Sequence, residues 1–280
     1  MQWRQYTPFF AACPARQTLR PACLSCKIIV TYITQGLPSP GKICYNAEYY
    51  LISLSSEGKP TMQTIKHFFK THPHAWWGAY LPIYLAMFFT IEHFITDNYW
   101  ATQTPLDAAI PFCEWFIFPY VSWSPLLVVL GIYLILKDGE GFRRYMWFIM
   151  VTFTTAVVFC ILVPNGQDLR PAVMEHHNLA TWLVEYTYSI DTNTNVFPSV
   201  HVLGVMALAA VWHTPGLQKP AWRWGVTLYG LVIIAATVFV KQHAAIDVLS
   251  GIFTSCIAYI FVYLIVGRRR DRRLAARREA

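Results

Sequence analysis

The sequence predicts an all-α protein that crosses a membrane repeatedly, as a bundle of six transmembrane helices. Its composition is the first reason: 55% of the 280 residues are hydrophobic and 13% are charged, whereas soluble domains carry about 25% charged residues. Aromatic residues point the same way, with 11 Trp, 16 Tyr and 18 Phe, because these rings favour the membrane–water boundary. The third reason is a series of separate apolar segments, described below.

The net charge of +7 would also suit a nucleic-acid binder, but the distribution of the basic residues argues against that class. They lie in short loops and in a C-terminal tail, residues 268–280, that directly follows the last apolar segment. Such a tail is typical of an orientation signal that also contacts anionic lipid. We therefore expect a membrane as partner and no nucleic acid.

Residues 1–61 differ from the rest of the chain. They mix Pro, Ser, Cys and basic residues without a sustained period, and the apolar run Ile28–Ile33 is too short to span a membrane. No apolar core followed by a small-residue cleavage site marks a signal peptide. We expect this segment to be disordered, or to come from an over-long gene model in which Met62 is the true start.

From Met62 onward, six apolar segments come near the roughly 20 residues that cross the hydrocarbon core. They form a predicted transmembrane domain over residues 62–267, ahead of the basic tail. The predicted spans are Trp76–Ile95, Pro119–Leu136, Tyr145–Val163, Val200–Trp212, Trp224–Val240 and Ile246–Val266.

Alternate loops between these spans are rich in positive charge. Lysines or arginines precede the first span, join the second to the third and the fourth to the fifth, and follow the sixth, whereas residues 164–199 carry Arg170 alone. The excess of positive charge marks cytoplasmic loops. We therefore expect a multi-pass cell-membrane protein with both termini in the cytoplasm and Arg170, Ser199 and Lys241 on the outer side.

The seven cysteines predict no metal or redox centre. Cys23 and Cys26 form a C-x-x-C, but no second pair or nearby histidine completes a metal site. Three others, Cys113, Cys160 and Cys256, lie in or beside apolar spans, where cysteine usually packs as a small hydrophobe. We expect no metal and no cofactor.

Three polar patches fall on the predicted outer side: NGQDLRP (165–171), FPSVH (197–201) and KQHAAID (241–247). Ionisable residues next to membrane spans are costly unless they serve a site. The last patch has His243 and Asp247 four residues apart, within reach on one helical face. The carboxylate could orient the imidazole as a nucleophile or base, or the pair could be a structural cap at a helix start.

The other two patches allow similar alternatives. Ser199 sits where a helix would begin, and helix N-termini bind phosphate well, yet it could be a plain N-cap with His201 at the interface. Arg170 has a planar fork suited to phosphate, or it is a surface arginine. Lys241 adds a charge near His243, or extends to the membrane interface. His176 and His177, in the same outer loop as Arg170, are expected at the surface.

Taken together, the three patches resemble the type 2 phosphatidic acid phosphatase superfamily, which shares its helical core with vanadium haloperoxidases. That family's pattern is K-x6-RP, then PSGH, then SR-x5-H-x3-D. The resemblance covers roughly residues 165–251. The matching positions are Arg170, Pro171, Pro198, Ser199, His201, His243 and Asp247.

The sequence also departs from the family pattern. Val163 stands where the family has its first lysine, Ala236 and Thr237 stand in place of the SR pair, and Val200 replaces the glycine of PSGH. Lys241 could compensate for the missing arginine. The forms FPSVH and KQHAAID look more like the branch that includes inositol-phosphorylceramide synthases, which transfers a head group.

The resemblance implies a lipid phosphate substrate and a two-step reaction without a metal. His243 would attack phosphorus and form a phosphohistidine, with Asp247 orienting it. His201 would protonate the leaving oxygen and then activate the acceptor. Phosphate oxygens would be held by Arg170, Ser199 and Lys241.

Three functions remain open on the sequence alone. The first is a lipid phosphate phosphatase with water as acceptor, and the second is a lipid head-group phosphotransferase with an alcohol as acceptor. The third, from another class, is a transporter or scaffold without catalysis. The clustering of ionisable residues at one face disfavours the third, since transport sites line mid-membrane positions.

Overall fold

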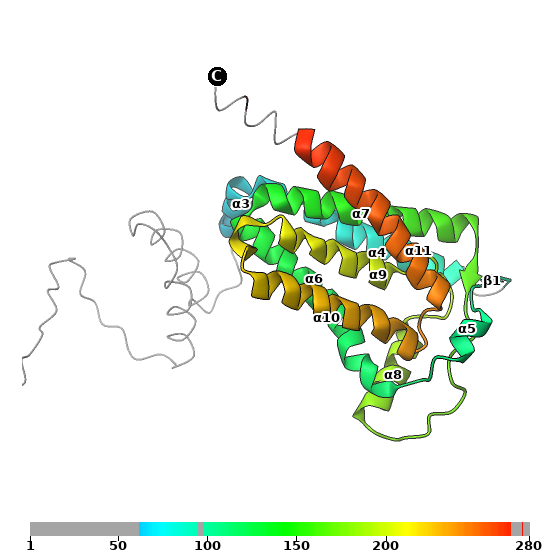
Figure 1. Cartoon of the computed structure of the whole chain (residues 1–280). Coiled ribbons are helices and arrows are strands. Elements are labelled where there is room, and N and C mark those ends of the chain that lie inside the picture. Colours follow the sequence, from blue (N-terminus) through cyan, green and yellow to red (C-terminus); the bar gives the residue numbers. More distant parts are fainter. Residues whose placement is uncertain (1–61, 95–97, 270–275, 277–280) are drawn as a thin grey trace, which may run out of the picture. The chain divides into compact units, whose positions relative to one another are not determined.

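The computed structural model describes residues 62–94, 98–269 and 276, and these are predominantly helical (Figure 1). The predicted segment 1–61 and most of the predicted tail lie outside the described residues. The chain divides into two units after Thr64, inside the first described helix, and every element after that helix belongs to the second unit. Its helices and strands, in chain order, are α3 (Met62–Thr71), η1 (Pro73–Ala79), α4 (Tyr80–Phe94), β1 (Trp100–Ala101), α5 (Pro105–Ala108), η2 (Glu114–Phe116), α6 (Ile117–Lys137), α7 (Gly139–Leu162), β2 (Asn165–Gly166), α8 (Leu179–Ile190), α9 (Val200–Ala207), η3 (Leu208–Trp212), η4 (Pro215–Leu217), α10 (Pro220–Phe239), α11 (Ala245–Tyr259) and η5 (Ile260–Gly267).

Four helices in the described part of the chain are long and apolar enough to cross a membrane: Glu114–Lys137, Gly139–Leu162, Pro220–Phe239 and Ala245–Gly267. This supports a polytopic membrane protein. The first and fourth predicted spans correspond to shorter helices, because Pro73–Ala79 is a separate 3₁₀ turn before α4 and Val200–Trp212 divides into α9 and η3. The count of six spans and the family's specific fold stay predictions.

α7 is the central helix of the bundle. It packs against α4, α6, α9 and α11 (Figure 1), and half of its most apolar stretch is buried, against 22 to 28% for the other three long helices. Its start is fixed by Asp138, whose Oδ1 accepts the backbone N–H of Gly141 at 2.9 Å, as an N-cap does. The remaining long helices expose apolar side chains outward, as expected of surfaces that face lipid.

A short strand pair orders the connecting segments at the Leu162 end of α7. β1 and β2 form a two-residue parallel pair in which Trp100 lies opposite Asn165. A further helix, α8, occupies part of the segment that the sequence predicts as one loop, residues 164–199. These connections bring the three polar patches to one end of the bundle.

Candidate functional site

Two histidines from separate patches meet at this end of the bundle. His201 lies in the first turn of α9, and His243 lies in the turn between α10 and α11. The Nδ1 of His201 is 3.0 Å from the Nε2 of His243, which is hydrogen-bond distance. One ring nitrogen must therefore carry a proton that the other accepts. We call this pair the histidine dyad.

Asp247 lies on the opposite side of the His243 ring. Its Oδ2 is 3.7 Å from Nδ1 of His243, which is ion-pair distance but too long for a hydrogen bond. The same Oδ2 accepts the backbone N–H of Ala244 at 2.7 Å. Both roles considered for the His243–Asp247 pair are therefore compatible with the structure: the Asp247 carboxylate caps the start of α11 and also faces the imidazole. This arrangement leaves Nε2 of His243 as the nitrogen turned toward His201.

Ser199 joins the second and third patches through its backbone. It is fully buried as the N-cap of α9, its Oγ accepts the N–H of Val202 at 3.4 Å, and its own N–H donates to the Asp247 carbonyl at 3.2 Å. Gly251 on α11 makes this approach possible, because a Cβ there would lie 2.9 Å from Val202 Cβ and 3.1 Å from the Ser199 carbonyl oxygen. Close packing of α9 on α11 thus aligns the two histidines.

His201 lies where two hollows meet. Its ring contacts the tilted rings of Tyr120 and Trp123 of α6, with centroid distances of 4.5 and 4.7 Å. The first hollow is a polar cavity of about 20 Å³ between the dyad and residues 191–196, which is room for a single water. The second is a groove of about 650 Å³ among α4, α6 and α7, whose wall is mostly apolar. His201 and Asp191 line both.

Arg170 contacts Gln242, the neighbour of His243 in the chain, but the chain itself binds its guanidinium. It donates to the carbonyls of Asp191 and Thr192, at 2.7 Å each, to the Tyr188 carbonyl, and to Oε1 of Gln242. The guanidinium also stacks over the Tyr188 ring at 4.3 Å. Desolvation lowers the pKa of Arg170, and the nearby Asp191 opposes that effect. Arg170 therefore orders the wall of the cavity. Its side chain reaches Gln242, so its positive charge is separated from the dyad by that residue.

Lys241 has a different environment from the phosphate ligand that the sequence predicts. Its Nζ donates to the carbonyls of Asp107, at 3.0 Å, and Ile110, in a segment more than 130 residues earlier. Asp107 in turn accepts the N–H of Ala245 at 2.7 Å through Oδ1. Desolvation lowers the pKa of Lys241, and Asp107 opposes the shift. With its ammonium bound to these carbonyls and absent from the cavity wall, Lys241 clamps the turn that carries His243.

Two carboxylates near the dyad were not found by sequence reasoning. Asp191 accepts the Tyr120 hydroxyl at 3.1 Å and the Gln242 side-chain amide at 3.2 Å. Glu92, which is buried on α4, accepts from Thr192 and from the side-chain amide of Asn195. Desolvation raises the pKa of Asp191, and the charge of Glu92 raises it further. Glu92 could have been found from the sequence, because it is an acidic residue near the end of the apolar run Tyr80–Phe94. A charge in a membrane span is costly and therefore marks a candidate functional residue.

The remaining candidates lie away from the dyad. His176 and His177 are exposed, as expected, and His176 pairs with Glu114 at 3.1 Å. Cys160 is buried and packs near Phe197, Cys113 is half-buried, Cys256 is exposed, and Cys23 and Cys26 lie outside the described residues. Within residues 62–94 and 98–269, no group of three or more His, Cys, Asp or Glu could hold a metal ion.

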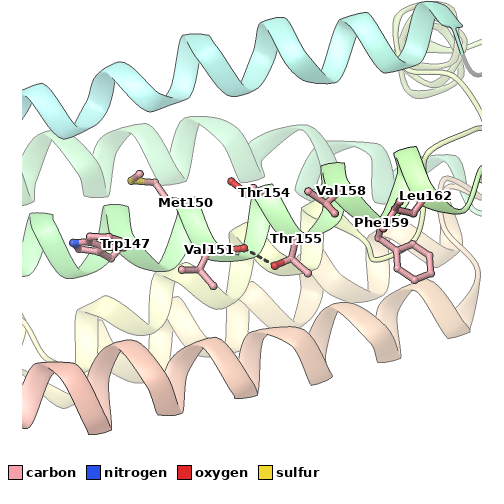
Figure 2. A pocket seen from close by; sticks show the side chains of 8 residues that line it. All are labelled: Trp147, Met150, Val151, Thr154, Thr155, Val158, Phe159 and Leu162. Atoms are coloured by element: carbon pink, nitrogen blue, oxygen red, sulfur yellow. Dashed lines mark hydrogen bonds between the residues drawn. The ribbon is translucent and has the colours of Figure 1, made fainter.

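A further hollow of about 510 Å³ runs along the surface of α7 (Figure 2). It is lined from Trp147 to Leu162 by side chains none of which is ionisable. This trough lacks the groups for acid–base or nucleophilic chemistry, so the histidine dyad is the better candidate for an active site.

The chain matches no family model, no curated protein and no solved structure. The site must therefore be interpreted from its own geometry and from the motif resemblance.

Proposed function

We propose that this chain is a membrane-embedded lipid phosphate phosphatase of the type 2 phosphatidic acid phosphatase kind, acting through a phosphohistidine. The observation that carries the proposal is the 3.0 Å contact between His201 and His243 at the end of an apolar groove. Two imidazoles in contact can divide the roles of nucleophile and general acid. The groove, about 650 Å³, has the size and apolar lining of a ligand site, and it suits a lipid tail.

In the proposed first step, the lone pair on Nε2 of His243 attacks phosphorus while the bond from phosphorus to the leaving oxygen breaks. His201 donates its proton to that oxygen. Asp247 faces the other ring nitrogen of His243 and stabilises the positive charge that develops on the imidazole. Because His201 now occupies the position in front of Nε2, the substrate phosphate must separate the two rings when it binds.

In the second step, water attacks the phosphohistidine, His201 accepts the water proton, and the phosphorus–nitrogen bond breaks. Inorganic phosphate leaves and His243 returns to its starting form. Arg170 contributes positive charge from behind Gln242, and Ser199 contributes the start of α9, whose N-terminus favours an anion. Lys241 is assigned to positioning the turn, in place of direct phosphate binding.

Transfer of a lipid head group to an alcohol is the second candidate, and the acidic wall of the polar cavity favours it. Asp191 lies beside the dyad and Glu92 lies behind Thr192. Carboxylates repel a doubly charged phosphomonoester more than a singly charged phosphodiester, and their oxygens accept hydrogen bonds from alcohol hydroxyls.

We also propose the multi-pass topology with both termini cytoplasmic and the dyad on the outer side, from the charges of the loops.

The test is purified enzyme in detergent with phosphatidic acid, a prenyl diphosphate, or a phospholipid plus an alcohol acceptor. Release of free phosphate that depends on both histidines supports hydrolysis. A new lipid product with the same dependence supports transfer. If the purified protein turns over none of these substrates, or if His243→Ala and His201→Ala both keep wild-type rates, the catalytic proposal fails and the transporter or scaffold alternative gains.

A further inference from the structure

The polar cavity beside the histidine dyad has a buried hydrogen-bond acceptor without a donor. Asn195 lines this cavity and is 5% exposed. Its Nδ2 donates to Oε1 of Glu92 at 3.0 Å and to Oγ1 of Thr194 at 3.1 Å. Its Oδ1 accepts no hydrogen bond from the described part of the chain. Because buried side-chain oxygens normally accept one, this oxygen points to a ligand that donates.

The carboxylate of Glu92 fixes which way the Asn195 amide faces. Turning the amide over would place Oδ1 against the carboxylate, where both atoms accept and neither donates. The backbone of Asn195 is held as well, since its N–H donates to the Asn165 carbonyl at 2.7 Å. Its φ of 58° lies in the left-handed region that Asn adopts more readily than most residues. Oδ1 is therefore presented on the side away from Glu92.

One wall of the cavity, residues 191–196, is tethered to two other elements. Thr192 donates to the Glu92 carboxylate through its backbone N–H and through its hydroxyl, which ties the wall to α4. Thr194 forms a backbone bridge with Gly166 of β2. With this wall held, the cavity keeps its small volume of about 20 Å³. That volume holds one water and is too small for an alcohol of several carbons.

The two hollows that meet at His201 therefore suit different reactants. The apolar groove of about 650 Å³ suits the lipid, whereas the polar cavity suits the acceptor. His201 and His243 both line the polar cavity. A water there can donate one O–H to Oδ1 of Asn195 and the other to His201, and a lone pair on its oxygen stays free to attack phosphorus.

We propose that Asn195 binds the acceptor water and that the polar cavity excludes larger alcohols, so that hydrolysis is the reaction at the dyad. This inference rests on the proposed function and names its acceptor. The water oxygen bonds to phosphorus while the bond from phosphorus to Nε2 of His243 breaks and its electron pair returns to the imidazole. One water proton passes to His201, and the other leaves with inorganic phosphate.

The test is turnover of phosphatidic acid or the prenyl diphosphate, whichever reacts faster, by the purified full-length protein with methanol, ethanol or propanol added. Water as acceptor gives inorganic phosphate, and an alcohol gives an alkyl phosphate. Their ratio reports which acceptor reaches the phosphohistidine, independently of how fast that intermediate forms. We expect wild type to form inorganic phosphate, a trace of methyl phosphate and no propyl phosphate.

Asn195→Ala removes the acceptor oxygen and enlarges the cavity. Breakdown of the phosphohistidine by water should slow about 10-fold, so the intermediate should accumulate and alkyl phosphates should form. Asn98→Ala is the matched control, because Asn98 has the same left-handed backbone, with φ of 55°, at an exposed position. The control should change neither the product ratio nor the level of phosphohistidine, and melting temperatures compare the folding of the two variants.

The alcohol series on wild type tests the size limit even if Asn195→Ala folds poorly. The inference is overturned if wild type forms propyl phosphate as readily as methyl phosphate, or a new lipid product from a long alcohol. It is also overturned if folded Asn195→Ala keeps the wild-type product ratio and phosphohistidine level. A wild-type protein without any turnover would instead overturn the proposed function, and this inference with it.

Discussion

The two ends of α7 carry cations that are held in opposite ways. Near Leu162, Arg170 and Lys241 donate to carbonyls of the chain itself; Lys241 is buried and Arg170 is half-buried. Near Gly139, Arg143 and Arg144 line an open pocket beside exposed apolar side chains. The first pair is held by backbone carbonyls, whereas the second pair is held by a carboxylate, that of Glu140, at 3.3 and 3.6 Å. The end near Leu162, where the cations order the chain around the dyad, is the one that we propose for catalysis.

The largest expected effect separates the two ends by activity. His243→Ala and His201→Ala should each lower turnover by about 10³-fold or more, because nucleophile and general acid act as a unit. Arg144→Gln, at the other end, should keep the rate within about twofold. Steady-state release of product from the best lipid in the panel measures all three. A histidine variant that retains the rate, or an Arg144 variant that loses it, breaks the comparison.

The next prediction concerns whether Lys241 shapes the site or binds substrate. Lys241→Met removes the ammonium donor from both carbonyls. The Asp107 carbonyl still accepts the Ile110 N–H at 3.4 Å, so the Ile110 carbonyl loses its side-chain donor, and an unpaired carbonyl costs about 1–3 kcal/mol when buried. We expect a lower melting temperature, with unchanged inhibition by inorganic phosphate. Lys219→Met, at an exposed lysine, is the control. Unchanged stability with weaker phosphate inhibition would instead place the ammonium on the substrate, as the sequence alone suggested.

A third prediction tests whether the apolar groove holds the lipid tail. Gly131 lines the groove, and a Cβ there meets ring atoms of Tyr145 and Phe142 at 3.7 Å or more. A Cβ at Gly131 therefore meets only ordinary contacts. The rest of a Leu side chain at this position should extend into the groove and occupy space needed by the tail, raising KM for long-chain substrates about 10-fold, while short-chain substrates are turned over as before. Gly225→Leu is the matched control, because nothing lies within 4 Å of its Cβ. Equal losses for both chain lengths would contradict the assignment.

The smallest expected effect is the pH dependence of stability that Asp191 contributes. Its pKa is raised above the ordinary value of 3.8, so the folded chain holds that proton more tightly than the unfolded chain. This contribution stabilises at low pH and is lost as pH rises through the raised pKa. Asp191→Asn cannot ionise, so its melting temperature should gain on wild type as the pH rises above the ordinary value of 3.8 and through the raised pKa. A difference that stays constant with pH would rule out this role for Asp191.

The sequence predicted the features that depend on local pattern. Of the six spans predicted from apolar length, four correspond to membrane-length helices in the described part of the chain, and the order of the motifs predicted that His201 and His243 would meet. The direction of the Lys241 side chain could not be predicted from the sequence. Its partners are backbone carbonyls more than 130 residues away, and every residue type has such a carbonyl. Helix α8 was missed because Leu179–Ile190 is short and lies in a loop between two spans. Asp191 was missed because a polar residue in a polar loop has no distinguishing signal.

The central claim is that His243 takes the phosphoryl group from a lipid. Rapid quenching of the purified enzyme during turnover, followed by peptide mass spectrometry under conditions that preserve phosphohistidine, measures this directly. The account predicts a phosphorylated peptide that contains His243, absent from His243→Ala. Turnover without any phosphopeptide, or with the phosphoryl group on a residue other than His243, would contradict it.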